Sequence, residues 1–306
     1  MFLEFDLANA EWVVTAYLAG DENMIEIIQS GRSPHIATGA LISGAPEEFV
    51  LEEHKLLGMQ SDPDTIRSIR KGLKIPQGIF MPRSMSIRQA GKKSNHGLNY
   101  GMRYRRFALE NEMPETDAKP ICEAYSTKAY PGLQDYWEDT KRLLRINNRV
   151  LENCFGRRVR LLGEWDHELF MAAYSFRPQS TVFDVCRTGM VSAFLDERPT
   201  FRPAALAAQV HDSLLYDYRS NEIELIWRFC MEMQTLMRPE LEITDPHGVR
   251  RSLTLGVDIK AGWDWGEMFP ISQPQDFELF LGIPGPSLPH RSEPLPPWEE
   301  EGHTSS

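Results

Sequence analysis

The stretch IRQAGKKSNHGLNYG, residues 87–101, constrains the fold and the function of this chain more than any other. Charged and aromatic side chains recur in it at every fourth position, namely Arg88, Lys92, His96 and Tyr100. Residues at that spacing lie along one slowly drifting stripe of an α-helix. We therefore predict a helix that begins after Ser84 or Ser86, each a plausible N-cap, and runs to about Gly101.

The predicted stripe carries two kinds of side chain. The cations of its first turns, together with the free amides of a helix N-terminus, suit the phosphates of a triphosphate. The imidazole of His96 and the phenol of Tyr100 suit stacking on a base. A solvated basic helix that packs Tyr100 into a core explains the same spacing, so the stripe alone leaves both interpretations open.

The composition is that of an ordinary globular protein, with 42% hydrophobic and 25% charged residues in a chain of 306. No apolar run approaches the ~20 residues that span a bilayer, and residues 1–6 lack the basic start and apolar stretch of a secretory signal. We expect a protein without membrane contact in the cytoplasm, or in the host cytoplasm if a phage encodes it. The four cysteines are scattered without a CxxC pair, which argues against a zinc site.

The formal net charge of -11 counts against a nucleic-acid partner, because phosphate binding depends on Lys and Arg. The distribution of charge favours one. Residues 83–106 contain several Lys and Arg and no acid, and basic residues recur through residues 141–160. Solvated helix faces would give the same pattern, so charge alone does not decide the matter.

Other segments predict local structure. Residues 2–7 have the β-propensity of a short buried strand that ends on Asp6. Residues 207–216 alternate as in a tight hairpin, and Asp21 can cap a helix. Further expectations are helices over 115–129, 132–151 and 167–195, a short strand within 156–162, an irregular or partly helical insertion at about 45–82, and disorder over the Pro-rich residues 283–306.

Three motifs occur in a fixed order along the chain. They are Asp6-Leu7-Ala8-Asn9-Ala10-Glu11, then Arg88-x-x-x-Lys92-x-x-Asn95-His96-Gly97-x-x-Tyr100-Gly101, then Gln209-Val210-His211-Asp212. In this order they resemble motifs A, B and C of the family A DNA polymerases, which include bacterial DNA polymerase I and many phage replicative enzymes. Shorter matches lie between them, among them Ser33-Pro34-His35, Tyr130-Pro131-Gly132 and Pro178-Gln179-Ser180, and the resemblance runs from about Glu4 to Met268.

The resemblance implies an α+β fold shaped as part of a right hand. An antiparallel sheet with helices would form the palm, from residues 1–12 and 166–270, and helices would form the fingers, from residues 13–165 with the insertion at about 45–82. Residues 271–306 would be a Pro-rich, disordered tail. These segments correspond to the C-terminal fingers and palm portion of the family, with the thumb absent.

The implied activity is that of a DNA-directed DNA polymerase, which adds dNTPs to a primer 3′ hydroxyl on a DNA template. Asp6 and Asp212, with the carbonyl of Leu7, would hold two Mg²⁺ ions, for which Mn²⁺ is an alternative. Two carboxylates that lie close together repel each other unless cations lie between them. For each Asp taken alone, a surface turn residue is the other explanation.

The resemblance also implies nucleotide and DNA contacts. The nucleotide-binding residues would be Glu11, His35, Arg88, Lys92, His96 and Tyr100. Lys92 would act as a catalytic residue beside the two aspartates by donating a proton to the leaving group, and Glu11 would crowd the sugar 2′ position of a ribonucleotide. Contacts with the primer-template would come from Gln179, Gln209 and His211.

Two positions depart from the family pattern. His96 stands where the family usually has Phe or Tyr, and Ser213 stands where Glu commonly follows the motif C aspartate. The second change removes an accessory carboxylate, so we predict retuned rather than absent activity. Because the sequence begins at motif A, we also expect a split phage polymerase, completed by a second polypeptide that carries the thumb, with or without an exonuclease.

Two other function classes stay open. A non-catalytic DNA-binding or assembly subunit could keep a polymerase-like fold, but the joint presence of Asp6, Asp212, Arg88 and Lys92 argues against it. A two-metal nuclease also uses paired carboxylates, but it leaves the stripe from Arg88 to Tyr100 unexplained.

Overall fold

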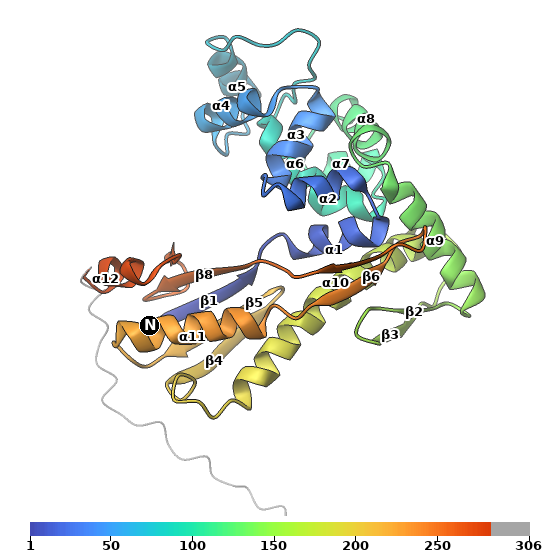
Figure 1. The fold of residues 1–306 in the computed structure, drawn as a ribbon. Coiled ribbons are helices and arrows are strands. Elements are labelled where there is room, and N and C mark those ends of the chain that lie inside the picture. The colour runs from blue at the N-terminus through green and yellow to red at the C-terminus, as the bar shows by residue number, and fades with distance from the viewer. Residues whose placement is uncertain (283–306) are drawn as a thin grey trace, which may run out of the picture.

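The structure, a computed structural model, describes residues 1–282 (Figure 1). Residues 283–306, for which we predict disorder, lie outside the described residues. Helices combine with antiparallel strands, as expected for an α+β fold. In Figure 1 helices α2 to α8 stand to one side of the main sheet, and α1, α9 and the long α10 connect the two parts.

The main sheet contains five antiparallel strands in the order β4-β5-β1-β8-β9. Its strands are β1 (Phe2–Leu7), β4 (Ala204–Val210), β5 (Ser213–Tyr218), β8 (Val257–Gly262) and β9 (Met268–Pro270). The first strand in sequence is central, which confirms the prediction for residues 2–7. Successive side chains of a strand point to opposite faces, so the fully buried Leu3 and Phe5 share one face while Glu4 and Asp6 share the other.

Helix α11 (Ile223–Leu236) covers the apolar face of this sheet. The ring of Phe229 lies 5.7 Å from that of Phe5 and 4.7 Å from that of Tyr218, measured between centroids. Such aromatic contacts add to the stabilisation that comes from burying apolar area. Because α11 occupies this face, the acidic residues of β1 lie on the opposite one.

Helix α10 (His167–Phe194) has 28 residues and packs against α1, α9 and α11. It begins at Asp166, whose side chain accepts a hydrogen bond from the amide of Leu169 at 2.9 Å. This N-cap satisfies an amide that the helix cannot. The helix confirms the prediction for residues 167–195 and connects the helical part to the sheet.

The remaining elements follow the chain. The helices are α1 (Ala10–Ala19), α2 (Glu22–Gln29), α3 (Pro34–Ser43), α4 (Glu47–Leu57), α5 (Pro63–Arg70), α6 (Ile87–Gly97) with the 3₁₀ turn η1 (Leu98–Tyr100), α7 (Tyr104–Glu110), α8 (Glu115–Ala124) with the π turn η2 (Tyr125–Ala129), α9 (Gly132–Ile146) and α12 (Pro274–Gly282). Two small sheets pair β2 (Val150–Glu152) with β3 (Arg158–Arg160) and β6 (Leu241–Thr244) with β7 (Arg250–Leu253).

Several boundaries differ from the sequence-based predictions. Of the two candidate caps of α6, the structure selects Ser86, which forms a capping box with Gln89. The helix predicted over 132–151 ends at Ile146, because residues 148 and 149 adopt left-handed backbone conformations that turn the chain into β2. The tail predicted from residue 271 is wrong for its first part, because α12 buries Phe277 and Phe280.

Membrane contact was not expected from the sequence. Among the described residues, no helix has both the length and the apolar character that a membrane crossing requires.

Candidate active site

Asp6 and Asp212 come from distant segments of the sequence and meet at one end of the main sheet. Asp6 lies opposite Ser213 in the register of β1 and β5, directly beside the β4–β5 hairpin turn. The amide of Leu7 donates a hydrogen bond to the carbonyl oxygen of Asp212 at 3.1 Å. The structure thus brings together the three residues that we predict to hold metal ions.

Burial and repulsion perturb the acidity of Asp6. Its pKa is raised to about 6, first by burial and then by the negative charge of Asp212. Lys260 on β8 opposes this effect, with its ammonium nitrogen 3.8 Å from the Asp6 carboxylate and 2.8 Å from that of Glu4. Two carboxylates that are held close together despite burial and mutual repulsion are typical of a functional site.

The hairpin that carries Asp212 has a strained turn. Its two central residues are His211 and Asp212, and His211 has a φ of 53°. Residues other than glycine seldom adopt this conformation. Gln209 supports the turn, because its side-chain amide donates to the carbonyl oxygen of His211 at 2.8 Å. Strain of this kind concentrates at active sites.

The predicted cationic stripe lies on α6, which crosses α3 at very short range. A Cβ added at Gly91 would lie 2.3 Å from the carbonyl oxygen of His35, and one added at Gly39 would lie 2.8 Å from that of Ile87. Only glycine allows the two backbones to approach so closely. This crossing positions His35 beside the exposed face of α6.

His35 faces three cationic or imidazole side chains of α6. Its pKa is lowered to about 4, first by burial and then by the charges of Arg88, His96 and Lys92. The rings of His35 and His96 lie 6.2 Å apart between centroids, and the pKa of His96 is also lowered, mainly by burial. Both imidazoles are therefore largely neutral at pH 7 beside the fixed charges of Arg88 and Lys92.

Glu11 is held in place by two other predicted site residues. Its carboxylate accepts hydrogen bonds from the hydroxyl of Tyr100 at 2.6 Å and from the side-chain amide of Gln179 at 3.4 Å. Tyr100 is only 9% exposed, so the structure supports the alternative in which its ring packs into the core. The buried phenol then orients Glu11.

A cleft of about 590 Å³ brings together half of the predicted site residues. Six of the predicted site residues line it, namely Glu11, His35, His96, Gln179, His211 and Asp212. The lining does not include Asp6, Leu7, Arg88, Lys92, Tyr100 or Gln209. Asp6 and Leu7 lie beside the Asp212 turn, and Arg88 and Lys92 lie near His35, which lines the cleft.

Sequence reasoning missed several residues that build the site. Buried Asn95 accepts a hydrogen bond from Thr38 at 2.9 Å, and its amide lies 3.4 Å from Nδ1 of His35. Lys260 and Asp258 lie next to Asp6 because β8 pairs with β1. The motif around Asn95 and the alternation of residues 257–262 were visible signals, but the pairing of β8 with β1 was not predicted.

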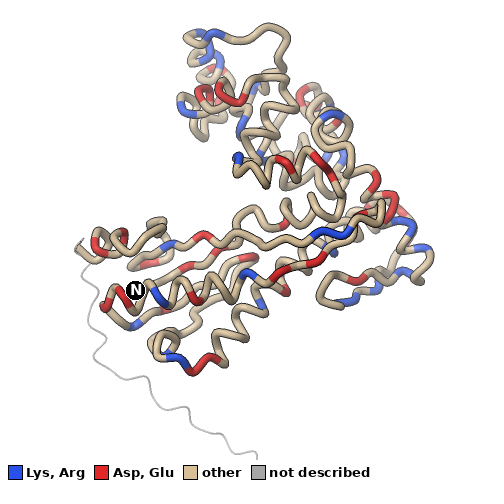
Figure 2. Tube along the Cα trace, viewed as in Figure 1, with Lys and Arg blue, Asp and Glu red and all other residues tan. Residues whose placement is uncertain are grey.

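The basic stretches are only partly free of acidic partners. Figure 2 shows Lys and Arg gathered on the β2–β3 hairpin and the end of α9. Within the described residues, Arg157 pairs with buried Asp184 at 2.7 Å and Arg158 pairs with Glu152 at 2.5 Å. Arg145 and Arg160 form no such pair in residues 1–282. The hairpin thus offers fewer free cations than its sequence suggests.

The donor set at Asp6 and Asp212 suits one class of metal ion. Within residues 1–282 there is no group of three or more His, Cys, Asp or Glu side chains arranged to bind a metal. A cation that depends on the protein for all its ligands would not fit. Mg²⁺ does fit, because it commonly binds through one or two carboxylates and completes its shell with water and substrate phosphates.

Comparisons with known proteins agree with these features. The chain is 26% identical over 274 residues to the thermostable DNA polymerase I of Thermus aquaticus and 23% identical over 268 residues to DNA polymerase I of Pseudomonas aeruginosa. These alignments cover 87% and 86% of the chain but only 27% and 24% of those proteins, so the chain spans about a quarter of their length.

The fold also matches a solved structure, the POL domain of Pol1 from M. smegmatis in complex with a DNA primer-template and dNTP. The TM-score is 0.60 with 19% sequence identity, and the match covers 86% of this chain and 40% of that one. At this identity the likeness concerns the fold. The family model described as DNA polymerase family A matches residues 80–267, more than half of the sequence. The chain belongs to DNA polymerase family A.

Proposed function

We propose that this chain carries the polymerase active site of a DNA-directed DNA polymerase, which adds dNTPs to a primer 3′ hydroxyl. One observation carries the proposal. Asp212, which is close to Asp6, lines the same cleft as His35 and His96, and His35 in turn lies beside the cations of α6. Carboxylates and cations around one cleft suit a reaction between a hydroxyl and a triphosphate.

The residues in and around the cleft would have separate roles. Arg88 and Lys92 would bind the triphosphate, next to the neutral His35, and Lys92 is the residue from which a proton would pass to the leaving pyrophosphate. Glu11, fixed by Tyr100 and Gln179, would exclude ribonucleotides at the sugar 2′ position. The remaining stripe residue, His96, would lie beside the incoming nucleotide.

Asp6 and Asp212, with the carbonyl of Leu7, are the residues that would hold two divalent ions, Mg²⁺ or Mn²⁺. Such ions, when bound, lower the pKa of the attacking hydroxyl and stabilise the charge that develops on the leaving group. The contribution of the chain is to hold two carboxylates together on one sheet, beside Lys260.

The domain division follows from this proposal. Residues 1–12 and 166–270 would form the palm, and residues 13–165 would form the fingers. The family-related Pol1 domain from M. smegmatis was solved with primer-template DNA and dNTP, and by analogy the ligands of this chain would be the same. Gln209 and His211 belong to the β4–β5 hairpin, Gln179 of α10 lines the same cleft as His211, and all three would contact the primer-template.

A second polypeptide is a further part of the proposal. An apolar groove of about 460 Å³ runs between the end of α10 and β4, and Phe194 and Leu206 on its lining are 86% and 44% exposed. Exposed apolar surface of this kind is typical of an interface. Strand β4 is also an outer strand of the sheet within residues 1–282, so it could pair with another strand. The phage context and the split arrangement stay predictions.

Primer extension tests the proposal directly. A labelled primer-template with Mg²⁺ and four dNTPs would be extended by the protein, alone or with a candidate partner, and extension would be lost in Asp6→Ala and Asp212→Ala. Co-purification with the product of a neighbouring gene tests the partner, and fully active monomer would contradict it. DNA binding without extension under any condition would favour the non-catalytic subunit, and cleavage without synthesis the nuclease.

A further inference from the structure

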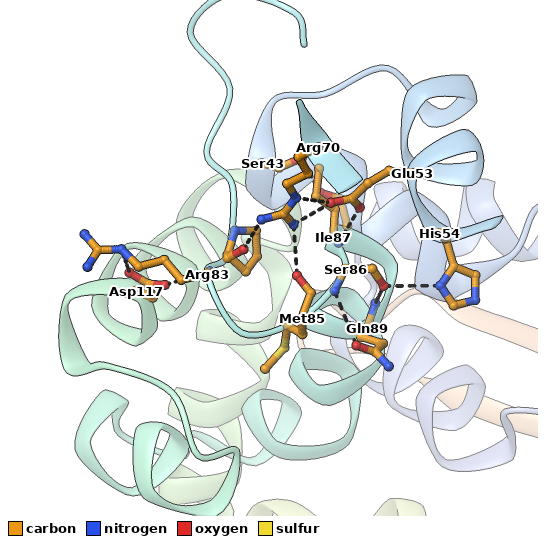
Figure 3. Close-up of polar contacts among 12 residues, drawn as sticks. Ser43, Glu53, His54, Arg70, Arg83, Met85, Ser86, Ile87, Gln89 and Asp117 are labelled. Atoms are coloured by element: carbon orange, nitrogen blue, oxygen red, sulfur yellow. Dashed lines mark hydrogen bonds and ion pairs between the residues drawn. The ribbon is translucent and has the colours of Figure 1, made fainter. Parts of the chain in front are cut away.

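The insertion at residues 45–82 lies against the N-terminal end of α6 rather than apart from it. Its helix α4 packs against α3, α5 and α6, and apolar Phe49 and Val50 of α4 form a small core with Ile87. Figure 3 shows that polar contacts from the insertion converge on the first turn of α6. The insertion is therefore built into the support of the predicted triphosphate-binding helix.

Glu53 and Arg70 fix this support. The Glu53 carboxylate, fully buried, accepts a hydrogen bond from the amide of Ile87 at 2.7 Å and another from Nε of Arg70 at 2.9 Å. Arg70 in turn donates to the carbonyl oxygen of Met85 at 3.0 Å (Figure 3). A carboxylate at a helix N-terminus is favourable for the helix dipole. The ion pair thus joins α4, α5 and α6 into one unit.

His54, the next residue of α4, reaches the N-cap of α6 and one residue of its first turn. Its Nδ1 lies 3.2 Å from Oγ of Ser86, and its Nε2 lies 3.3 Å from Nη1 of Arg88. A guanidinium only donates hydrogen bonds, so Nε2 accepts and the proton of the neutral ring resides on Nδ1, which donates to Ser86. Burial, and then the charge of Arg88, lower the pKa of His54 and favour this neutral form.

The choice of partner matters for Arg88. Within residues 1–282 no ion pair joins Arg88 to a carboxylate. A carboxylate partner would orient the guanidinium but would neutralise it and compete with a bound anion. A neutral imidazole orients the same group and leaves its charge available. Arg88 also lies close enough to His35 to lower its pKa, and His35 lines the cleft, so the oriented guanidinium lies beside a residue of the cleft.

We propose that His54, supplied by the insertion, is a positioning residue that orients Arg88 toward the triphosphate of the incoming nucleotide. The inference rests on the proposed function. It extends the nucleotide site to a segment that lies between the motifs. Because the contact acts on ligand binding, its loss should raise KM for dNTP more than it lowers kcat.

The two ring nitrogens allow a matched pair of variants. In His54→Gln the side-chain oxygen can replace Nε2 as acceptor for Arg88, whereas in His54→Asn the shorter amide reaches only the position of Nδ1 beside Ser86. We expect KM for dNTP to rise about fivefold in His54→Ala and His54→Asn and to change less than twofold in His54→Gln. The control is Lys55→Ala, a substitution at the exposed residue that follows His54. A helix-capping role through Ser86 predicts the opposite order for Asn and Gln.

Binding of inorganic tripolyphosphate, measured by calorimetry, provides a readout that needs no turnover. The same order of affinities is expected, and His54→Ala should have no further effect in an Arg88→Ala background. Equal affinities for all four His54 forms, or additive losses in the double variant, would overturn the inference while leaving wild-type primer extension intact. Failure of the proposed function would instead appear as absent extension by the wild type together with normal tripolyphosphate binding.

Discussion

Histidine 35 gives the chain a pH-dependent stability that can be calculated from the structure. The imidazole of His35 is partly buried against α6 and faces Arg88, His96 and Lys92, and this environment lowers its pKa to about 4. In the unfolded chain the pKa returns to about 6.5. Between these two values the unfolded state binds a proton that the folded state does not bind, so stability rises with pH.

The size of the effect follows from the two pKa values. The contribution of His35 to the free energy of unfolding is complete above pH 6.5, decreases as the pH falls below 6.5, and is lost below about pH 4. Between pH 7 and pH 5 the loss is about 2 kcal/mol, since each pKa unit corresponds to about 1.4 kcal/mol. Replacement of the ring by an amide in His35→Gln removes this titration.

Urea denaturation at pH 7 and pH 5 measures the difference. The free energy of unfolding of the wild type should decrease by about 2 kcal/mol more than that of His35→Gln over this interval. Arg88→Ala removes the strongest of the neighbouring charges, so it should reduce the wild-type loss in part. An equal pH dependence for the wild type and His35→Gln would refute the partly buried, cation-facing position of His35.

Two further predictions concern the packing of the cleft walls. Gly91→Ala should destabilise the fold by about 1–3 kcal/mol in thermal or urea unfolding, because its Cβ would lie 2.3 Å from a backbone oxygen of α3. The loss is expected even though alanine favours helices. The control is Gly72→Ala, whose Cβ would meet only one atom at 3.5 Å and which should leave the stability nearly unchanged. Tyr100→Phe removes the 2.6 Å hydrogen bond to Glu11, so the ratio of kcat/KM for dNTP to that for NTP should fall roughly tenfold, and an unchanged ratio would contradict the role given to Glu11.

Much of the fold could be predicted because local signals were strong. β-Propensity identified the strand at residues 2–7, and the N-cap candidates Asp21 and Ser86 marked helix starts that the structure contains. Positions where local sequence competes with tertiary contacts were predicted less well. The helix after Gly132 stops early at left-handed residues, and α12 is ordered because its two phenylalanines find a core that the local composition does not reveal.

The site was predictable only as far as its residues lie in motifs. The motifs placed Asp6 and Asp212 in the right strand and turn, but the partners supplied by distant segments could not be read from them. Lys260 reaches Asp6 through the pairing of β1 with β8, whose members are about 250 residues apart. His54 reaches Arg88 through the packing of an insertion, and no periodicity in the sequence reports such a contact.

The most direct test of the central claim is single-turnover incorporation of one correct dNTP by the wild type and by Asp212→Asn. The variant keeps the size of the side chain and removes its charge. The matched control is Asp217→Asn, which makes the same change on β5 outside the cleft. We predict a rate at least about a hundredfold lower for Asp212→Asn and unchanged for the control. Equal rates for all three proteins would contradict a polymerase site built on Asp212.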